Sequence, residues 1–267
     1  MKALFFILFS FLSILQAHSQ DASVILYKSL KQFGGAKVWN NFQDMSYEYT
    51  VLLTGSYQKD SLNKKTGIIY HQQTIKKGGY SFFNSYKESK QLFGVMVYNP
   101  QRTHYISYNR EGDEVVNSKK DLEKNVFFNE DTDIQLIGLM IYNAQKTDKY
   151  EVKKLSNTVF ENKECFRIFV KEKVNDKNEF RVLLIDTKNY HLLSVQIYDV
   201  NDMEMKYPNI SYHFTKFTEK QGYVVPEVYT SVYTPNNFRM RIKSVSENTV
   251  TKVEFNKGIS EDMFKIE

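Results

Sequence analysis

The chain has 267 residues with a single cysteine, and its 36 Lys and Arg residues against 31 Asp and Glu residues give a net charge of +5 at pH 7. One cysteine excludes an intrachain disulfide. The basic residues are spread along the chain and form no patch, and no nucleic-acid-binding motif is present, so we expect no nucleic-acid partner.

The first residues have the pattern of a secretory signal peptide. A basic second residue precedes an apolar run from Ala3 to Leu15, and small residues lead up to a predicted cleavage between Ser19 and Gln20. The alternative is a membrane anchor, although this run is short for a helix that spans a bilayer. We therefore predict a signal peptide over residues 1–19 and a periplasmic location.

The predicted elements begin with a helix from Asp21 to Phe33, in which apolar residues recur at helical spacing. Gly34 and Gly35 end this helix, because glycine adopts the left-handed cap conformation without strain. A short second helical turn, Ala36 to Asn41, carries Trp39.

From Met45 onward the residues alternate with a period of two, which is typical of β-strands. In MSYEYTVLL, Tyr47, Tyr49 and Val51 share one face of the first strand. The segments TGIIYHQ, YSFFNSY, LFGVMVYN and THYISYN follow, so about five strands precede residue 110. The charged stretch from Asn109 to Asn129 has no predicted element.

An apolar helix is predicted in mid-chain, from Ile134 to Ala144. Asp131 or Thr132 is expected to cap its start. A helix that is apolar nearly all round is buried on more than one side. Its apolar stripe consists of Ile134, Ile137, Met140, Ile141 and Ala144.

The second half of the chain returns to strands. The segment FRVLLIDTKNYHLLSVQIYD, Phe180 to Asp199, is a predicted hairpin whose turn begins at Asp186. Since no repeat or low-complexity linker divides the chain, residues 20–267 are predicted to form one domain. The predicted strands are Tyr150 to Leu155, Cys165 to Lys171, Phe180 to Ile185, Leu192 to Tyr198, Ile210 to Phe217, Val224 to Tyr233, Phe238 to Val245 and Val250 to Phe255.

Reactive side chains form no recognisable catalytic motif. The histidines are isolated, and Cys165 lies in a strand on the face opposite Phe166, as a structural thiol would. We therefore predict no catalytic residue, no metal site and no cofactor. The alternative is a hydrolase whose site is assembled from distant residues such as His104, His213 and Asp186.

Aromatic residues are abundant, with 19 Tyr and 20 Phe. Many belong to an ordinary sheet core, but a curved antiparallel sheet also has a concave side that can hold a ligand. A large apolar pocket is by default a site for a small molecule or a lipid. An acyl chain gains about 0.8 kcal/mol for each methylene group removed from water.

The order of these elements resembles the periplasmic outer-membrane lipoprotein carriers, the LolA-like superfamily, and in particular the variants of Bacteroidetes-type bacteria. The resemblance rests on the signal peptide, the first helix ending in Gly-Gly before Trp39, the strand series and the apolar mid-chain helix. The hairpin Phe180 to Asp199 and the tail VEFNKGISEDMFKIE are similar to the corresponding parts of that superfamily.

The resemblance implies a mainly β fold with helices, an incomplete antiparallel β-barrel of about eleven strands with a helical lid. It implies a non-enzymatic protein that holds the acyl chains of a lipoprotein or lipid for transfer to the outer membrane, with inner- or outer-membrane envelope proteins as further partners. The arginine by which carriers latch the lid from the first strand has no counterpart in MSYEYTVLL. Relatives on this fold also sense envelope stress, so the alternative is a sensor or interaction protein.

The candidate ligand-binding residues come from two elements, the first strand and the predicted lid helix. They are Tyr47, Tyr49, Val51, Ile134, Ile137, Met140 and Ile141.

Overall fold

The computed structural model of the chain describes residues 21–58, 61–63, 69–77, 80–87, 92–98, 102–108, 114–121, 134–145, 149–173, 179–199, 205, 207–234 and 243–265. The predicted signal peptide, both candidate caps of the mid-chain helix and most of the predicted strand Phe238 to Val245 lie outside these residues.

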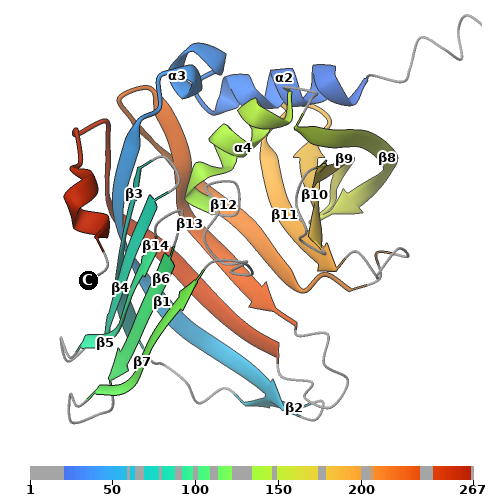
Figure 1. The fold of residues 1–267 in the computed structure, drawn as a ribbon. Coiled ribbons are helices and arrows are strands. Elements are labelled where there is room, and N and C mark those ends of the chain that lie inside the picture. The colour runs from blue at the N-terminus through green and yellow to red at the C-terminus, as the bar shows by residue number, and fades with distance from the viewer. Residues whose placement is uncertain are drawn as a thin grey trace, which may run out of the picture.

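One antiparallel sheet of 14 strands forms most of the molecule (Figure 1). Its strands follow the order β7-β6-β5-β4-β3-β1-β14-β13-β12-β11-β10-β9-β8, and β2 pairs only with β1. The strands are β1 Asp44–Gln58, β2 Ser61–Asn63, β3 Ile69–Lys77, β4 Tyr80–Lys87, β5 Leu92–Tyr98, β6 Arg102–Tyr108, β7 Glu114–Asp121, β8 Tyr150–Phe160, β9 Lys163–Glu172, β10 Glu179–Asp186, β11 Leu192–Asp199, β12 Ile210–Lys220, β13 Tyr223–Tyr233 and β14 Lys243–Phe255.

The predicted fold class, an open antiparallel sheet with a few helices, is confirmed. The sheet has more strands than the expected number of about eleven. One addition is β7, which lies inside the charged stretch for which the sequence predicts no element. It pairs with β6 through its backbone, and polar side chains do not prevent such pairing.

Strand β1 joins the two halves of the chain. It pairs with β3 on one side and with β14 on the other, where Met45 lies opposite Phe255. Register shifts in the β1–β14 ladder, between Glu48 and Tyr49 and between Leu53 and Gly55, are typical of bulges that increase twist and curvature. The sheet curves strongly, and the helices lie on its concave side, here called the inner face (Figure 1).

Two consecutive helices cross one end of the curved sheet (Figure 1), α2 Ala22–Gln32 and α3 Ala36–Asn40. The side chain of Asp21 accepts a hydrogen bond from the Ser23 amide at 3.2 Å, which caps the start of α2 as a helix N-cap should. The predicted stop is also confirmed, since Gly34 has φ +95° and a β-carbon there would lie 2.0 Å from the carbonyl oxygen of Gly222.

The mid-chain helix is observed as the 3₁₀ turn η2 Ile134–Leu136 followed by α4 Ile137–Ala144. It contacts α2, α3 and the strands β8 and β13, so it fills the space between the outer helices and the sheet (Figure 1). This position explains why the sequence of the helix is apolar on nearly every side. The main hydrophobic core therefore lies under the helices and includes Leu26, Trp39, Met45, Ile141 and Phe255.

A second hydrophobic cluster lies on the opposite, outer face of β9, β10 and β11. It contains Cys165, Phe180, Val182, Leu184 and Tyr198, all buried, while Phe166 on the other parity joins the main core. The predicted orientation of Cys165 is thus confirmed. The register shift between Leu155 and Thr158 bends the end of β8, and Phe160 packs on this cluster.

The C-terminal tail is fixed to the start of β1 by a buried carboxylate. Asp44 is 1% exposed and accepts hydrogen bonds from the amides of Lys257, Gly258 and Ile259 at 2.8–3.2 Å. The tail then forms the 3₁₀ turn η3 Glu261–Phe264, which lies against β4. The Phe264 ring packs on Tyr80 with 5.4 Å between the ring centroids.

Candidate functional site

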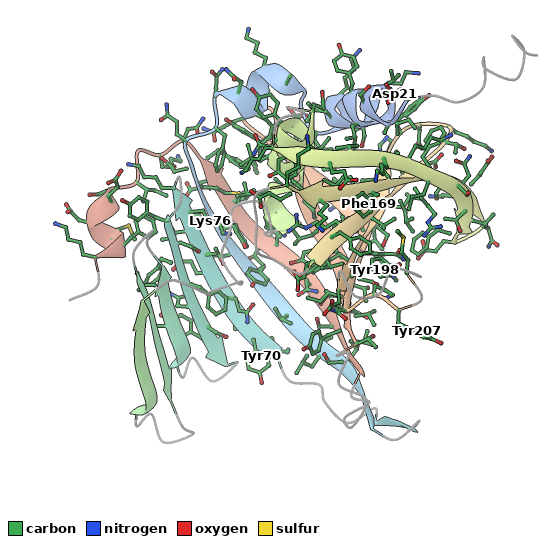
Figure 2. All side chains as sticks on the ribbon, turned by 45° about the vertical axis from the view of Figure 1, so that its right-hand side comes forward. Asp21, Tyr70, Lys76, Phe169, Tyr198 and Tyr207 are labelled. Carbon is green, nitrogen blue, oxygen red and sulfur yellow. The ribbon has the colours of Figure 1, made fainter. Side chains whose placement is uncertain are left out.

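A cavity of about 360 Å³ lies on the inner face of the sheet. Six strands and η2 contribute to its wall, so distant segments of the chain meet there. Figure 2 labels Lys76 and Tyr70 on β3, with Lys76 at the end of the strand nearer the helices. The lining residues are Tyr47, Tyr49, Val51, Gln72, Thr74, Lys76, Phe83, Ile134, Tyr212, Tyr229, Ser231, Ser246 and Asn248.

One wall of this cavity is formed by the residues that alternation places on a single face of β1. Tyr47, Tyr49 and Val51 all face it, and the two tyrosine rings lie 5.4 Å apart. In the next strand Thr74 is the partner of Tyr47 and Gln72 is the partner of Tyr49. Directly opposed residues of an antiparallel pair share a face, so β3 continues the same wall.

The predicted lid residues divide into two groups. Ile134, on η2, lines the cavity. Ile137, Met140 and Ile141 are at most 2% exposed and belong to the main core, where α4 is enclosed by α2, α3 and the sheet. The structure therefore brings Tyr47, Tyr49, Val51 and Ile134 together at the cavity. The other three candidates do not line the cavity and are buried in the main core.

Polar residues of β13 and β14 form part of the cavity wall that the sequence does not predict. The hydroxyl oxygens of Ser231 and Ser246 are 2.6 Å apart, and the Asn248 amide nitrogen donates to the Ser231 hydroxyl at 3.2 Å and to the Tyr229 carbonyl at 3.3 Å. Asn248 is 4% exposed, so these bonds supply the partners that a buried amide requires.

A second polar strip follows β3 and β4 on the inner face. Thr74, Lys76 and Ser85 are each 3% exposed, and the Gln72 amide nitrogen donates to the Ser85 hydroxyl at 3.3 Å. The cavity expected from the sequence was apolar, and this expectation is wrong for half of the wall. Aromatic and aliphatic side chains share it with hydroxyls, amides and one ammonium group.

The residues of the alternative hydrolase site lie elsewhere on the sheet. Asp186 begins the tight turn after β10, where its carboxylate accepts from the Lys188 amide at 2.7 Å. His213 packs edge-on against Phe160, and burial lowers the pKa of its imidazole. Neither residue lines the cavity, and the side chain of His104 lies outside the part of the structure that is described.

The described residues were also compared with the requirements of a reactive thiol, a metal site and a membrane-spanning helix. Burial raises the pKa of the Cys165 thiol, which is the environment of a structural cysteine. Within the described ranges, no three His, Cys, Asp or Glu side chains come together as metal ligands. Among the helices of the same residues, none has the length and apolar character needed to cross a membrane.

Comparisons with known proteins find likeness in structure alone. No protein-family model matches the chain, and no curated protein matches it in sequence. A DUF1329 family protein from Desulfovibrio piger superposes with a TM-score of 0.52 and 10% identity, over 92% of this chain and 98% of the other. A LolA superfamily protein from Nitrosomonas europaea gives 0.51 and 11%, over 93% and 99%.

At this level of identity the two likenesses concern the fold, and they extend over more than nine-tenths of this chain and nearly the whole of both structures. The predicted kinship with Bacteroidetes-type variants stays a prediction. The site itself must be judged from its own residues.

Proposed function

Because the chain has the LolA-like fold, we propose that it is an exported, non-enzymatic binding protein that holds an acyl chain of a lipid or lipoprotein on the inner face of its sheet. The observation that carries this proposal is the cavity of about 360 Å³ between the curved sheet and η2. Its size falls within the range of small-molecule sites, about 300–1,000 Å³.

The aromatic part of the wall supplies apolar contact area for such a chain. Tyr47, Tyr49 and Phe83 present rings to the cavity, and Val51 and Ile134 add aliphatic surface. Each methylene that moves from water to this surface contributes about 0.8 kcal/mol. A chain of ordinary length therefore reaches useful affinity without any reactive group in the protein.

The cavity volume favours a ligand with a single chain. It lies near the lower end of the range for small-molecule sites, about 300–1,000 Å³, whereas a lipoprotein carries several acyl chains. Ile137, Met140 and Ile141 are fully packed under α2 and α3. A larger ligand thus requires α4 to move as a lid, and the helix would then expose these three residues to the acyl chains.

The cellular setting belongs to the same proposal. A signal peptide over residues 1–19 delivers a single domain, residues 20–267, to the periplasm, where lipids or lipoproteins pass between the membranes. Transfer to the outer membrane follows if an envelope protein accepts the ligand.

The direct test is mass spectrometry of organic extracts from protein purified out of a periplasmic fraction. A lipid or acyl species at about one per protein molecule supports the proposal and identifies the ligand class. A protein that carries no lipid, and instead co-purifies with one envelope protein, would favour the sensor or interaction role. Turnover of an ester substrate that a His213 variant loses would favour the hydrolase.

A further inference from the structure

A second cavity, of about 270 Å³, lies on the outer face of the sheet and is here called the outer pocket. It spans β4, β3, β1 and β14, which are consecutive neighbours in the sheet (Figure 1). Glu48 follows Tyr47 in β1, and successive residues of a strand point to opposite faces, so Glu48 lies on the outer face. The lining includes Glu48, His71, Gln73, Asn84, Tyr86 and Thr251.

The outer pocket differs from the inner cavity in its chemistry. Every described residue that lines it has a polar side chain, whereas Val51 and Ile134 give the inner cavity aliphatic surface. Such a wall offers little to an acyl chain and many groups to a ligand that forms hydrogen bonds. The volume is just below the range of small-molecule sites, about 300–1,000 Å³, so the ligand group is small.

One buried amide in this wall lacks part of its hydrogen bonding. Asn84 is 7% exposed, and its Nδ2 donates to Gln73 Oε1 at 3.2 Å. Its Oδ1 is buried and has no partner among the described residues. Buried polar atoms nearly always have a partner, so this oxygen is explained by a donor on a bound ligand.

A β-bulge forms the opposite side of the outer pocket. The register shift between Glu48 and Tyr49 leaves Thr251 with no residue opposite it in β1. The Thr251 hydroxyl donates to the Glu48 carbonyl at 3.2 Å, and Thr251 lines the pocket. Bulges redirect side chains in this way, so the pocket is built from strands that are far apart in the sequence.

The charges around the outer pocket favour a neutral ligand. Glu48 is the only Asp, Glu, Lys or Arg residue among the described lining residues, and its carboxylate lies 3.9 Å from the Lys252 ammonium. A ligand ammonium would compete with Lys252 for this carboxylate. A hydroxyl group both donates and accepts, so it matches the Asn84 oxygen and the Glu48 carboxylate while the ion pair remains.

We propose that the outer pocket binds one sugar unit, either a free monosaccharide or a unit of a glycan chain. One sugar hydroxyl donates to Asn84 Oδ1 and a second donates to the Glu48 carboxylate. Tyr86 adds a side chain with an apolar ring and a polar hydroxyl, which suits the mixed surface of a sugar. This site is separate from the cavity of the proposed lipid-binding function and does not depend on it.

The test follows the side-chain amide signals of Asn84 and Gln73 in proton–nitrogen correlation NMR spectra of the mature chain. The probes are glucose, galactose, mannose and N-acetylglucosamine, with methylammonium as a cationic probe. We expect at least one sugar to shift both amides in a saturable manner and methylammonium to shift neither. A trisaccharide of that sugar that binds about tenfold more tightly indicates a glycan, and equal affinity indicates the free sugar.

Two substitutions connect sugar binding to the wall of the pocket. Asn84→Leu removes the unpartnered oxygen and should lower the affinity at least about fivefold, the effect of about one hydrogen bond. The matched control is Asn157→Leu, because Asn157 is exposed on β8, bonds to Glu164 and should leave the affinity unchanged. If Asn84→Leu fails to fold, Glu48→Ala serves instead, since that side chain is 45% exposed, and should weaken binding similarly.

Three results would overturn the inference. Amide signals that none of the four sugars shifts would remove the sugar site and leave the lipid-binding proposal intact. Shifts caused by methylammonium alone would show a cation site in its place. Sugar binding that Asn84→Leu and Glu48→Ala both leave unchanged would place the sugar outside the outer pocket.

Discussion

The indole ring of Trp39 lies directly on Gly138, so closely that a β-carbon on the glycine would be 2.3 Å from the ring carbon Cζ2. The same indole donates from Nε1 to the carbonyl of Phe33 at 2.7 Å, which fixes its position. The contact joins α3 to α4 across the main core. The absence of a side chain at one position thus sets the distance between the outer and the inner helical layer.

The first prediction concerns this contact. Gly138→Ala should lower the free energy of unfolding by about 1–3 kcal/mol, because the new methyl group overlaps a fixed ring. On helix propensity alone the same change would stabilise α4 by up to about 1 kcal/mol. Urea denaturation of the single variants and the double variant with Trp39→Leu checks the cause. A penalty of equal size in both backgrounds would contradict the proposed overlap.

The second prediction concerns the C-terminal tail. Asp44→Asn retains the shape of the side chain but removes the charge that three backbone amides share. We expect a loss of about 1–3 kcal/mol in unfolding free energy, and faster hydrogen exchange at Lys257, Gly258 and Ile259. Asp262→Asn is the control, because that carboxylate is 73% exposed. Unchanged exchange in Asp44→Asn would show that the carboxylate does not hold the tail.

The third prediction tests the cavity by filling it. Val51→Trp places a large ring in a space of about 360 Å³, so we expect lipid content to fall at least about tenfold. Leu52→Trp makes the same change on the next residue of β1, which faces the opposite side of the sheet. Mass spectrometry of the two purified variants gives the comparison. Equal lipid content in both would place the ligand outside this cavity.

The fourth prediction concerns pH. Burial lowers the pKa of His213, and the nearby Glu161 opposes this shift more weakly. The unfolded chain therefore binds a proton at a higher pH than the folded chain does, so protonation of His213 favours unfolding. Stability should fall as the pH drops below about 6.5, the ordinary value for histidine. In His213→Phe this dependence should be weaker between pH 7 and 5, measured by urea denaturation.

The two ends of α2 and the alternation of β1 were predictable because each depends on local chemistry. Asp21 caps α2, Gly34 takes a positive φ angle, and the inner face of β1 carries the residues that alternation assigned to one side. The turn after β10 likewise follows from Asp186. In each case a few neighbouring residues determine the structure.

The polar part of the cavity wall on β3 was not predictable. The usual rule assigns the apolar face of a strand to the inside, and β3 does not follow it. Its sequence IYHQQTIKK is polar on both faces. Apolar Ile75 is buried on the outer face, while Lys76 and Thr74 are buried on the inner one. Alternation gives the two faces of a strand but not which of them lies inside. Only the pairing of Tyr47 with Thr74 resolves this ambiguity.

The pairing of β1 with β14 has a consequence for how the molecule forms. Met45 and Phe255 are neighbours in the sheet and lie 210 residues apart in the sequence, so among the described strands this ladder joins the pair most distant along the chain. Such non-local pairing slows folding, because the chain loses conformational entropy in closing the loop before the stabilising contacts have formed. Until β14 has paired with β1, the backbone groups on that edge of β1 have no strand partner. Under the export proposed above, the sheet is complete only after the chain as far as Phe255 has crossed the membrane.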